Sequence, residues 1–271
     1  MDIMRQGVQA VILDWAGTAI DYGCQAPPRV FQEVFGRMGV PITDKQAREP
    51  MGRAKRDHIA AILEMPPVSA RWQAKFGATP SDVDVDRLYQ LFLPLQKDVL
   101  AQHCDLIPGA TDFAACCVKN HVRIGSSTGY TRELMDVVTP LAAQQGYAPE
   151  CTLCADDVPK GRPAPWMIFA AAQRMGTYPI NTLVVVDDTP VGIEAGHNAG
   201  CWTVAVIKSS NELGLTLRQV EALPEHELQA RLELVRQKFV RMKTHYVIDS
   251  VAELWQTIQE IDRRIAFGER P

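Results

Sequence analysis

The sequence predicts an α/β fold, in which a parallel sheet is covered by helices on both faces and is interrupted by an all-helical insertion. A short apolar run at 8–13 has the length of a buried strand, and the patterns over 22–104 are all helical. After residue 105, short apolar runs alternate with helical segments, which is typical of strands and crossover helices. We therefore predict a core domain of 1–21 and 105–271 and a helical domain of 22–104.

Composition excludes several classes of protein. The 271 residues are 46% hydrophobic and 22% charged, as in an ordinary globular protein, and the net charge of −4 argues against a nucleic-acid surface. Asp2 and Arg5 precede the first apolar run, so we expect no signal peptide, and no segment has membrane-spanning length. Seven scattered cysteines favour reduced thiols in the cytoplasm. Cys151 and Cys154 form a lone C-x-x-C, which we interpret as incidental rather than as a metal or redox site.

The insertion is predicted to be a run of helices separated by proline and glycine breaks. Thr43 and Gln46 have the spacing of a capping box, which predicts that a helix begins there. The helical segments are expected near residues 30–38, 43–49, 51–63, 68–76 and 80–103.

The core is predicted to alternate strands with helices. Trp15, Trp166 and Trp202 lie in or beside apolar segments and are expected in the interior. Strands are expected at 8–13, 122–125, 183–186 and 202–206, with a further segment at 151–157 and a strand–helix unit at 246–265. Helices are expected at 110–119, 131–145, 165–175, 191–198 and 225–243.

Polar residues follow the ends of the predicted strands. Asp14 ends the first strand, and the polar turn 126–130 follows the second. Arg162 lies in a basic loop after the third region, and Asp187 and Asp188 end the strand at 183–186. Because the carboxyl ends of parallel strands share one edge of the sheet, these groups are expected to converge on one crevice.

This set of groups predicts phosphoryl chemistry. Carboxylates from different strands suit Mg²⁺, which takes hard oxygen ligands and keeps waters and substrate phosphate. The hydroxyl and backbone N–H groups of the polar turn, which is expected to open a helix, suit phosphate oxygens. Asp14 is then a nucleophile, a metal ligand or both, and the alternative is a residue that simply ends a strand.

Lys55 in the insertion is a second chemical candidate. A lysine amine condenses with an aldehyde to an iminium, which is an electron sink. The flanking Arg53 and Arg56 are expected to push Lys55 toward its neutral form, and His58 on the same helix face is placed to move protons. From spacing alone, a solvated basic helix face is the alternative interpretation.

In this order, the groups resemble the haloacid dehalogenase superfamily. The resemblance implies a Rossmann-like parallel-sheet core of the haloacid dehalogenase type with an inserted helical cap domain. It implies that Asp14 attacks phosphorus to form an aspartyl phosphate and that Ser126 or Thr128 supplies the hydroxyl. Arg162 stands where a lysine is more usual, and Asp188 matches the distal Mg²⁺ ligand.

Position 16 departs from the pattern of the superfamily's phosphatases. These usually carry a second aspartate two residues after the nucleophile, which protonates an alkoxide leaving group. Here the residue is Ala16, so an ester oxygen would lack that proton donor. We interpret this as a slow or defunct phosphatase, or as an enzyme whose leaving group is not an alkoxide.

A narrower resemblance covers essentially the whole chain. The chain is similar to the phosphonoacetaldehyde hydrolases (phosphonatases) in the motifs DWAGT, MG-x-x-K-x-DH, GS-x-TGYT, DDVP-x-GRP-x-PWM, NAG-x-WTV and SSNELGLT. The resemblance implies Mg²⁺-dependent hydrolysis of the carbon–phosphorus bond of phosphonoacetaldehyde to acetaldehyde and phosphate, in 2-aminoethylphosphonate degradation. It also implies a cytoplasmic homodimer built largely through the caps.

The same resemblance implies a role for each site residue. Asp14 is the nucleophile, Lys55 forms the Schiff base and His58 moves protons. Mg²⁺ is bound by Asp14, the backbone carbonyl of Ala16, and Asp188. The remaining residues hold the phosphorus-bound oxygens (Ser126, Ser127, Thr128, Gly129 and Arg162) or line the site of the aldehyde (Cys24, Met51 and Tyr130).

The distal acidic motif departs from the family. The family often has Gly-Asp there, with a further acidic residue four positions later, whereas this chain has Asp187 before Asp188 and Gly192 at the later position. Asp187 is expected either to replace the missing carboxylate or to compete for the metal.

Two other functions stay open from the sequence. One is a hydrolase of the same superfamily that acts on a phosphate ester, which Ala16 and Lys55 oppose. The other is a non-catalytic protein that binds a phosphometabolite, which Asp14 and Asp188 oppose.

Overall fold

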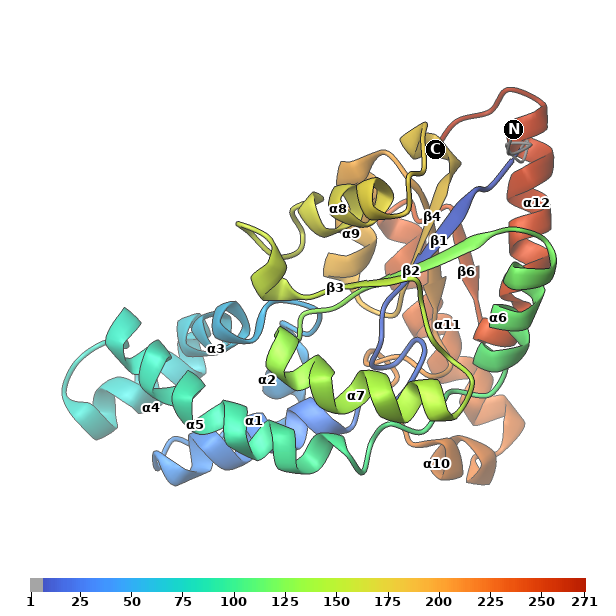
Figure 1. Ribbon diagram of the computed structural model, residues 1–271. Coiled ribbons are helices and arrows are strands. Elements are labelled where there is room, and N and C mark those ends of the chain that lie inside the picture. Colours follow the sequence, from blue (N-terminus) through green and yellow to red (C-terminus); the bar gives the residue numbers. More distant parts are fainter. Residues whose placement is uncertain (1–6) are drawn as a thin grey trace.

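Six parallel strands form one sheet in the order β3-β2-β1-β4-β5-β6 in the computed structural model (Figure 1). The strands are β1 (Ala10–Leu13), β2 (Arg123–Ser127), β3 (Cys151–Leu153), β4 (Leu183–Asp187), β5 (Trp202–Val206) and β6 (Tyr246–Ile248). The structure describes residues 7–271, so Asp2 and Arg5, on which the expected absence of a signal peptide depends, lie outside the described residues.

The apolar runs become central strands because both of their faces are covered. Val11 and Leu13 pack on one face with helices α6 and α12, and the alternate residues Ala10 and Ile12 pack on the other face with α8 and α9. The core helices are α6 (Ala110–Lys119), α7 (Arg132–Gln144), α8 (Trp166–Arg174), α9 (Pro190–Ala199), α10 (Leu217–Ala222), α11 (Glu225–Arg241) and α12 (Leu254–Ala266).

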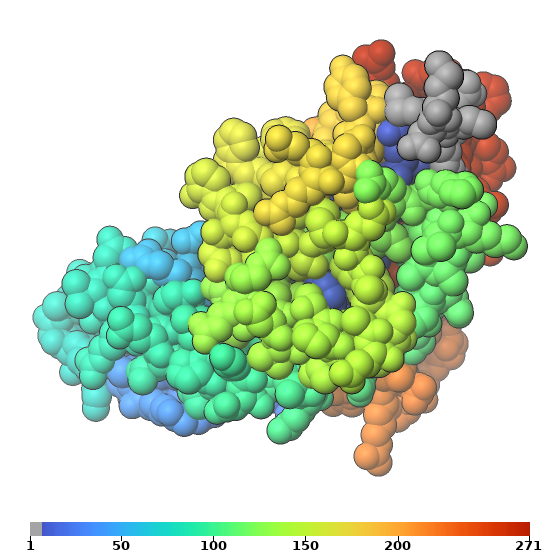
Figure 2. All heavy atoms as spheres, in the orientation of Figure 1, coloured from blue at the N-terminus to red at the C-terminus, as the bar shows by residue number. Residues whose placement is uncertain are grey.

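The insertion folds into a helical lobe beside the sheet, which Figures 1 and 2 show in blue to teal. Its hydrophobic core is a cluster of its own, in which Phe31 stacks on Phe92 with ring centroids 4.4 Å apart. The predicted capping box of Thr43 and Gln46 is confirmed and opens the second helix. The helices are α1 (Ala26–Arg37), α2 (Asp44–Arg48), α3 (Lys55–Glu64), α4 (Pro66–Phe76) and α5 (Asp82–Leu100).

The parallel sheet and the helical insertion confirm the predicted α/β fold, but two details of the prediction are wrong. Ser126 and Ser127 belong to β2 rather than to a turn, because their small side chains are buried in the sheet, and α7 begins only at Arg132. Trp166 is 50% exposed instead of buried, since it begins α8 on the solvent side and packs on Phe169. Trp15 and Trp202 are fully buried, as predicted.

The helices were compared with the length and apolar composition of a membrane span. Within residues 7–271, none of them combines the length and the apolar composition that a membrane span needs.

The aromatic stack of the helical lobe gives a stability prediction. Phe92→Ala, at a fully buried position, should lower the free energy of unfolding by about 3–5 kcal/mol because it leaves a cavity against Phe31. Chemical denaturation measures this change. Val83→Ala on the same helix, at a side chain that is 76% exposed, should stay within about 0.5 kcal/mol. Equal effects of the two substitutions would contradict the assignment of Phe92 to the lobe's core.

Candidate active site

Asp14 lies directly after β1, at the carboxyl edge of the sheet. Its backbone N–H donates to the carbonyl of Val186 at 2.9 Å, which extends the pairing of β1 with β4 beyond the last strand residue. The side chain is 6% exposed, and its Oδ1 accepts a hydrogen bond from Nη1 of Arg162 at 2.7 Å. The backbone therefore fixes the carboxylate at the end of the sheet, as the sequence predicts.

Arg162 joins the ends of three strands. Its Nη1 contacts Oδ1 of Asp14 and lies 3.0 Å from Oδ2 of Asp187, so it connects β1 with β4. Its Nη2 donates to the hydroxyl and the carbonyl oxygen of Ser127 in β2, at 2.7 Å each. The guanidinium is almost fully buried, and its fork of donors is matched by oxygen acceptors.

Three buried carboxylates converge beside this arginine. Oxygen atoms of Asp14, Asp187 and Asp188 lie within 4.8 Å of one another. Burial raises the pKa of Asp14 to about 7, and the charge of Asp187 adds to this rise while Arg162 opposes it. Burial, followed by the charges of Asp14 and Asp187, raises the pKa of Asp188 well above its usual range.

This cluster fits a hard divalent cation. Its donors are carboxylate oxygens from two strand ends in a small buried space, which is the ligand type that such a cation prefers. Ala16 lines the same cavity as Asp14. Asp188 is held in place by Oγ1 of Thr18 at 3.3 Å and by the backbone N–H of Asn211 at 2.7 Å.

Asp187 occupies the space that a side chain at position 192 would need. A Cβ atom on Gly192 would overlap the Asp187 carboxylate. That carboxylate is fixed on one side by the N–H and hydroxyl of Thr189, at 2.8 and 2.6 Å, and on the other by Arg162. The two departures in the distal motif are therefore one structural feature, since an aspartate at 187 requires a glycine at 192.

The hydroxyl residues of β2 point in different directions. Ser126 accepts a hydrogen bond from Nε1 of Trp15 at 2.8 Å and lies 3.0 Å from Oγ1 of Thr152, so its hydroxyl is engaged away from Asp14. Ser127, the next residue, faces Arg162, because side chains alternate along a strand. The placement of Ser126 among the phosphate ligands is thus not supported by its position, and Ser127 takes the place beside the arginine.

A small cavity of about 20 Å³ lies between Asp14 and the helical lobe. A cavity of this size holds about one water molecule, so it is closed to a substrate. The predicted site residues that line it are Asp14, Ala16, Cys24, Met51, Lys55, Thr128, Gly129 and Tyr130. The sequence prediction missed three further lining residues, Pro27, Gly52 and Thr189. Thr189 begins α9 directly before a proline, and this helix-start signal was present in the sequence.

Lys55 is the first residue of α3 and is 3% exposed, so the solvated-face alternative is excluded. Its Nζ lies 4.7 Å from the ring centroid of Tyr130. Burial lowers the pKa of Lys55 to about 8, and the charge of the Asp14 carboxylate opposes this shift.

The expected effect of the flanking arginines on Lys55 is wrong for Arg56. Its guanidinium lies at the surface and pairs with Asp86 at 2.7 Å and Asp82 at 3.3 Å. After burial, the positive charge that lowers the pKa of Lys55 is that of Arg162 in the core.

His58 is buried one turn after Lys55 and is neutral. Burial, followed by the charge of Lys55, lowers the pKa of His58 well below its usual range. Its Nε2 lies 2.8 Å from the carbonyl of Ala47, and its ring packs on Phe31. With Nε2 as the donor, Nδ1 is an acceptor, and this nitrogen is buried without a hydrogen-bond partner.

The sheet order, the aspartate after β1, the aspartate pair after β4 and the helical insertion together define the class of protein. They are the architecture of the haloacid dehalogenase-like hydrolases, and the family model of that name matches residues 8–200.

Relatives that match over nearly the full length identify the family within this class. The chain is 46% identical to a phosphonoacetaldehyde hydrolase of Paraburkholderia xenovorans, over 97% of this chain and 99% of that one. It is 43% identical to a protein of the same name from Bacillus cereus, over 95% and 97%. A crystal structure of a phosphonoacetaldehyde hydrolase-like protein from Oleispira antarctica superposes with a TM-score of 0.97 at 39% identity, over 100% of this chain and 99% of that one. The chain belongs to the phosphonoacetaldehyde hydrolase family, which confirms the resemblance seen in its motifs.

The pairing of Asp187 with Gly192 gives a second prediction. Gly192→Ala should lower the free energy of unfolding by about 1–3 kcal/mol, because the added methyl group overlaps a carboxylate that hydrogen bonds hold in place. Adding Asp187→Ala should relieve the overlap, so that the two changes together cost less than their sum. Chemical denaturation of the single and double variants measures the coupling.

Gly36→Ala is the matched control for this prediction. Gly36 also lies in a helix, but a Cβ atom there meets open space, so the change should be neutral or stabilise the protein by up to about 1 kcal/mol. If Gly192→Ala were as stable as Gly36→Ala, positions 187 and 192 would not compete for space.

Proposed function

We propose that the protein hydrolyses the carbon–phosphorus bond of phosphonoacetaldehyde to acetaldehyde and phosphate, as part of 2-aminoethylphosphonate degradation. The observation that carries this proposal is the meeting of Lys55 and Asp14 at one closed cavity. An amine whose pKa is about 8 and a carboxylate held at the end of β1 are the two nucleophiles that this reaction needs. The names of the full-length relatives support the same substrate.

Lys55 prepares the carbon–phosphorus bond for cleavage. Its neutral amine attacks the aldehyde carbon, water leaves, and a protonated imine forms. The imine nitrogen is then beta to phosphorus and can accept the electron pair of the breaking bond. The product of cleavage is an enamine, so no free carbanion has to form. Ala16 agrees with this route, because no alkoxide leaving group needs a proton.

Asp14 receives the phosphoryl group. Its carboxylate oxygen attacks phosphorus in line while the carbon–phosphorus bond breaks, which gives an aspartyl phosphate and the enamine. Protonation of the enamine carbon and addition of water release acetaldehyde and free Lys55. A second water molecule then releases phosphate from Asp14.

Arg162 and the end of β2 hold the phosphorus-bound oxygens in this proposal. Arg162 is already aligned on Asp14 and Ser127 and directs its positive charge toward the group in transfer. Thr128 and Gly129 line the cavity beside it.

Mg²⁺ is the cofactor that we assign to the acidic cluster. Asp14, the backbone carbonyl of Ala16, and Asp188 would hold it, and Asp187 would stay beside Arg162 in place of the carboxylate that is missing at position 192. When bound, the cation supplies charge neutralisation for the transferring group.

The helical domain supplies the aldehyde side of the site. We propose that 22–104 act as a cap over a core of 1–21 and 105–271, with Cys24, Met51 and Tyr130 around the aldehyde. Burial raises the pKa values of Cys24 and Tyr130 well above their usual ranges, so both stay protonated. His58 remains the proposed proton shuttle, and its unpartnered Nδ1 supports an acceptor role.

We also propose a homodimer that forms through the caps, where Phe76 and Val83 expose apolar surface. We further propose a cytoplasmic location, which the free thiols of Cys151 and Cys154 support.

Two alternatives make different predictions. A phosphate-ester hydrolase of the same superfamily would turn over a generic aryl phosphate without modification of Lys55. A non-catalytic binding protein would release no phosphate from any substrate.

Borohydride trapping tests the imine. Incubation with phosphonoacetaldehyde and borohydride should place a two-carbon adduct on Lys55, located by peptide mass mapping, and Lys55→Arg should give none. Because the neutral amine reacts, the rate of adduct formation should rise with pH and level off above about 8, whereas an ordinary lysine would level off near about 10. Phosphate release without an adduct would leave an Asp14 phosphohydrolase. The absence of both would favour the binding protein.

Asp14→Asn separates the two halves of the reaction. The variant should still form an adduct on Lys55, one that keeps the phosphonate group, because the imine needs no carboxylate nucleophile and the carbon–phosphorus bond stays intact. Its phosphate release should fall by at least about 10³-fold. A phosphate assay and the trapping assay on the same sample measure both effects, and phosphate release near the level of the unaltered enzyme would exclude Asp14 as the nucleophile.

A further inference from the structure

We propose that Arg48 and Asn211 form a latch that holds the helical domain closed over the active site, and we call this pair the Arg48–Asn211 latch. Both are positioning residues, since they contact neither Lys55 nor the reacting groups. The inference rests on the proposed function, because it concerns closure of the same site.

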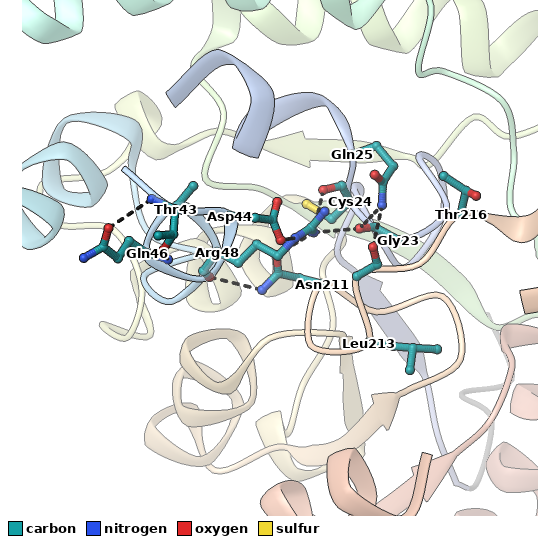
Figure 3. Close-up of polar contacts among 12 residues, drawn as sticks. Gly23, Cys24, Gln25, Thr43, Asp44, Gln46, Arg48, Asn211, Leu213 and Thr216 are labelled. Carbon is teal, nitrogen blue, oxygen red and sulfur yellow. Dashed lines mark hydrogen bonds and ion pairs between the residues drawn. The ribbon is translucent and has the colours of Figure 1, made fainter. Parts of the chain in front are cut away.

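Arg48 reaches from the helical domain into the core (Figure 3). It is the last residue of α2, and its Nη1 donates to the carbonyl oxygens of Gly23 at 2.9 Å and Cys24 at 3.0 Å, where the chain passes from β1 into the helical domain. The same nitrogen lies 3.3 Å from Oδ1 of Asn211, in the loop after β5. One guanidinium therefore connects α2, the turn at the start of the insertion and a loop of the core.

Asn211 donates a hydrogen bond to Arg48 and a second one to the acidic cluster. Its Nδ2 donates to the backbone carbonyl of Arg48 at 3.2 Å, and its backbone N–H donates to Oδ2 of Asp188 at 2.7 Å. Asn211 is 2% exposed, so both contacts are shielded from water. A single residue thus links the position of the helical domain to a carboxylate of the active site.

Little else holds α2 against the core. Beside the latch is an open cleft of about 660 Å³, lined by α2 residues such as Lys45 on one side and by Leu213, Gly214 and Lys238 on the other. This cleft separates much of α2 from the loop after β5. The ion pair of Arg48 with Asp44 at 2.8 Å stays within α2 and orients the guanidinium.

Another contact between the helical domain and the core, along α5, has a different character. At the far end of α5, Leu93 and Val99 pack against the main hydrophobic cluster of the core, and Lys97 pairs with Glu133 of α7. One side of the domain is thus joined by apolar packing and the other by a few hydrogen bonds. The hydrogen-bonded side is the one that can separate without exposing apolar surface, so opening is expected there.

Opening is required for each turnover, because a cavity of about 20 Å³ cannot admit a substrate. Hydrogen bonds to a charged group are strong enough to shift such an equilibrium about tenfold or more. Loss of the latch should therefore raise the population of the open state, in which Lys55 is accessible to solvent.

Chemical labelling of Lys55 tests the latch in the full chain without substrate. The rate of acetylation of Lys55 by acetic anhydride is measured by mass mapping against Lys75, an exposed lysine of the same domain. Arg48→Lys keeps the charge but loses the Nε group, whose pair with Asp44 orients the side chain, and Asn211→Ala keeps the backbone N–H to Asp188. Each variant should label Lys55 about tenfold faster, and the double variant should add little more. KM for the aldehyde should rise more than kcat falls.

Arg37→Ala is the control, because Arg37 makes the same type of ion pair within a helix of this domain, with Glu33 at 2.5 Å, and does not contact the core. It should leave labelling and kinetics unchanged, and thermal unfolding checks that every variant is folded. Unchanged labelling in both Arg48→Lys and Asn211→Ala, or equal acceleration in Arg37→Ala, would overturn the latch. Because labelling needs no substrate, failure of the proposed function, seen as no trapped adduct in the unaltered enzyme, is distinguished from failure of the latch.

Discussion

The buried guanidinium of Arg162 is the contact on which the arrangement of the site depends. Two of its partners are carboxylates, Asp14 after β1 and Asp187 at the end of β4, and the third is Ser127 of β2. Removing one partner of a buried ion pair costs about 3–5 kcal/mol, because a charge is left without compensation. The geometry of three strand ends and the charge of the site are therefore fixed by the same side chain.

This charge balance also connects the two nucleophiles. Asp14 and Lys55 belong to different domains, but the charge of Asp14 raises the pKa of Lys55 while burial lowers it. The carboxylate of Asp14 therefore influences the protonation of a lysine on the helical lobe.

The sequence predicts the groups that follow the strands because buried strands and their polar ends leave a clear local pattern. The sequence predicts less well which of the two serine hydroxyls of β2 faces the site. Ser126 and Ser127 differ only in which side of β2 they occupy, and one residue of register decides this. The acidic partners of Arg56 and the reach of Asn211 to Asp188 join residues far apart in the chain. No local pattern records such contacts, although the polar motif around Asn211 marks the loop as unusual.

The division of the site between a sheet and a helical lobe follows from these contacts. Asp14, Arg162 and Asp188 are fixed by the parallel sheet and its edge, which cannot rearrange without breaking several buried hydrogen bonds. Lys55 is carried by a lobe with a hydrophobic core of its own, so the lobe can move as a unit while its interior stays packed. A rigid nucleophile and a movable amine suit a reaction in which the aldehyde must enter before the imine can form. In the proposed reaction, closure excludes water from Asp14 and Lys55, which agrees with the burial of Lys55 at the first turn of α3.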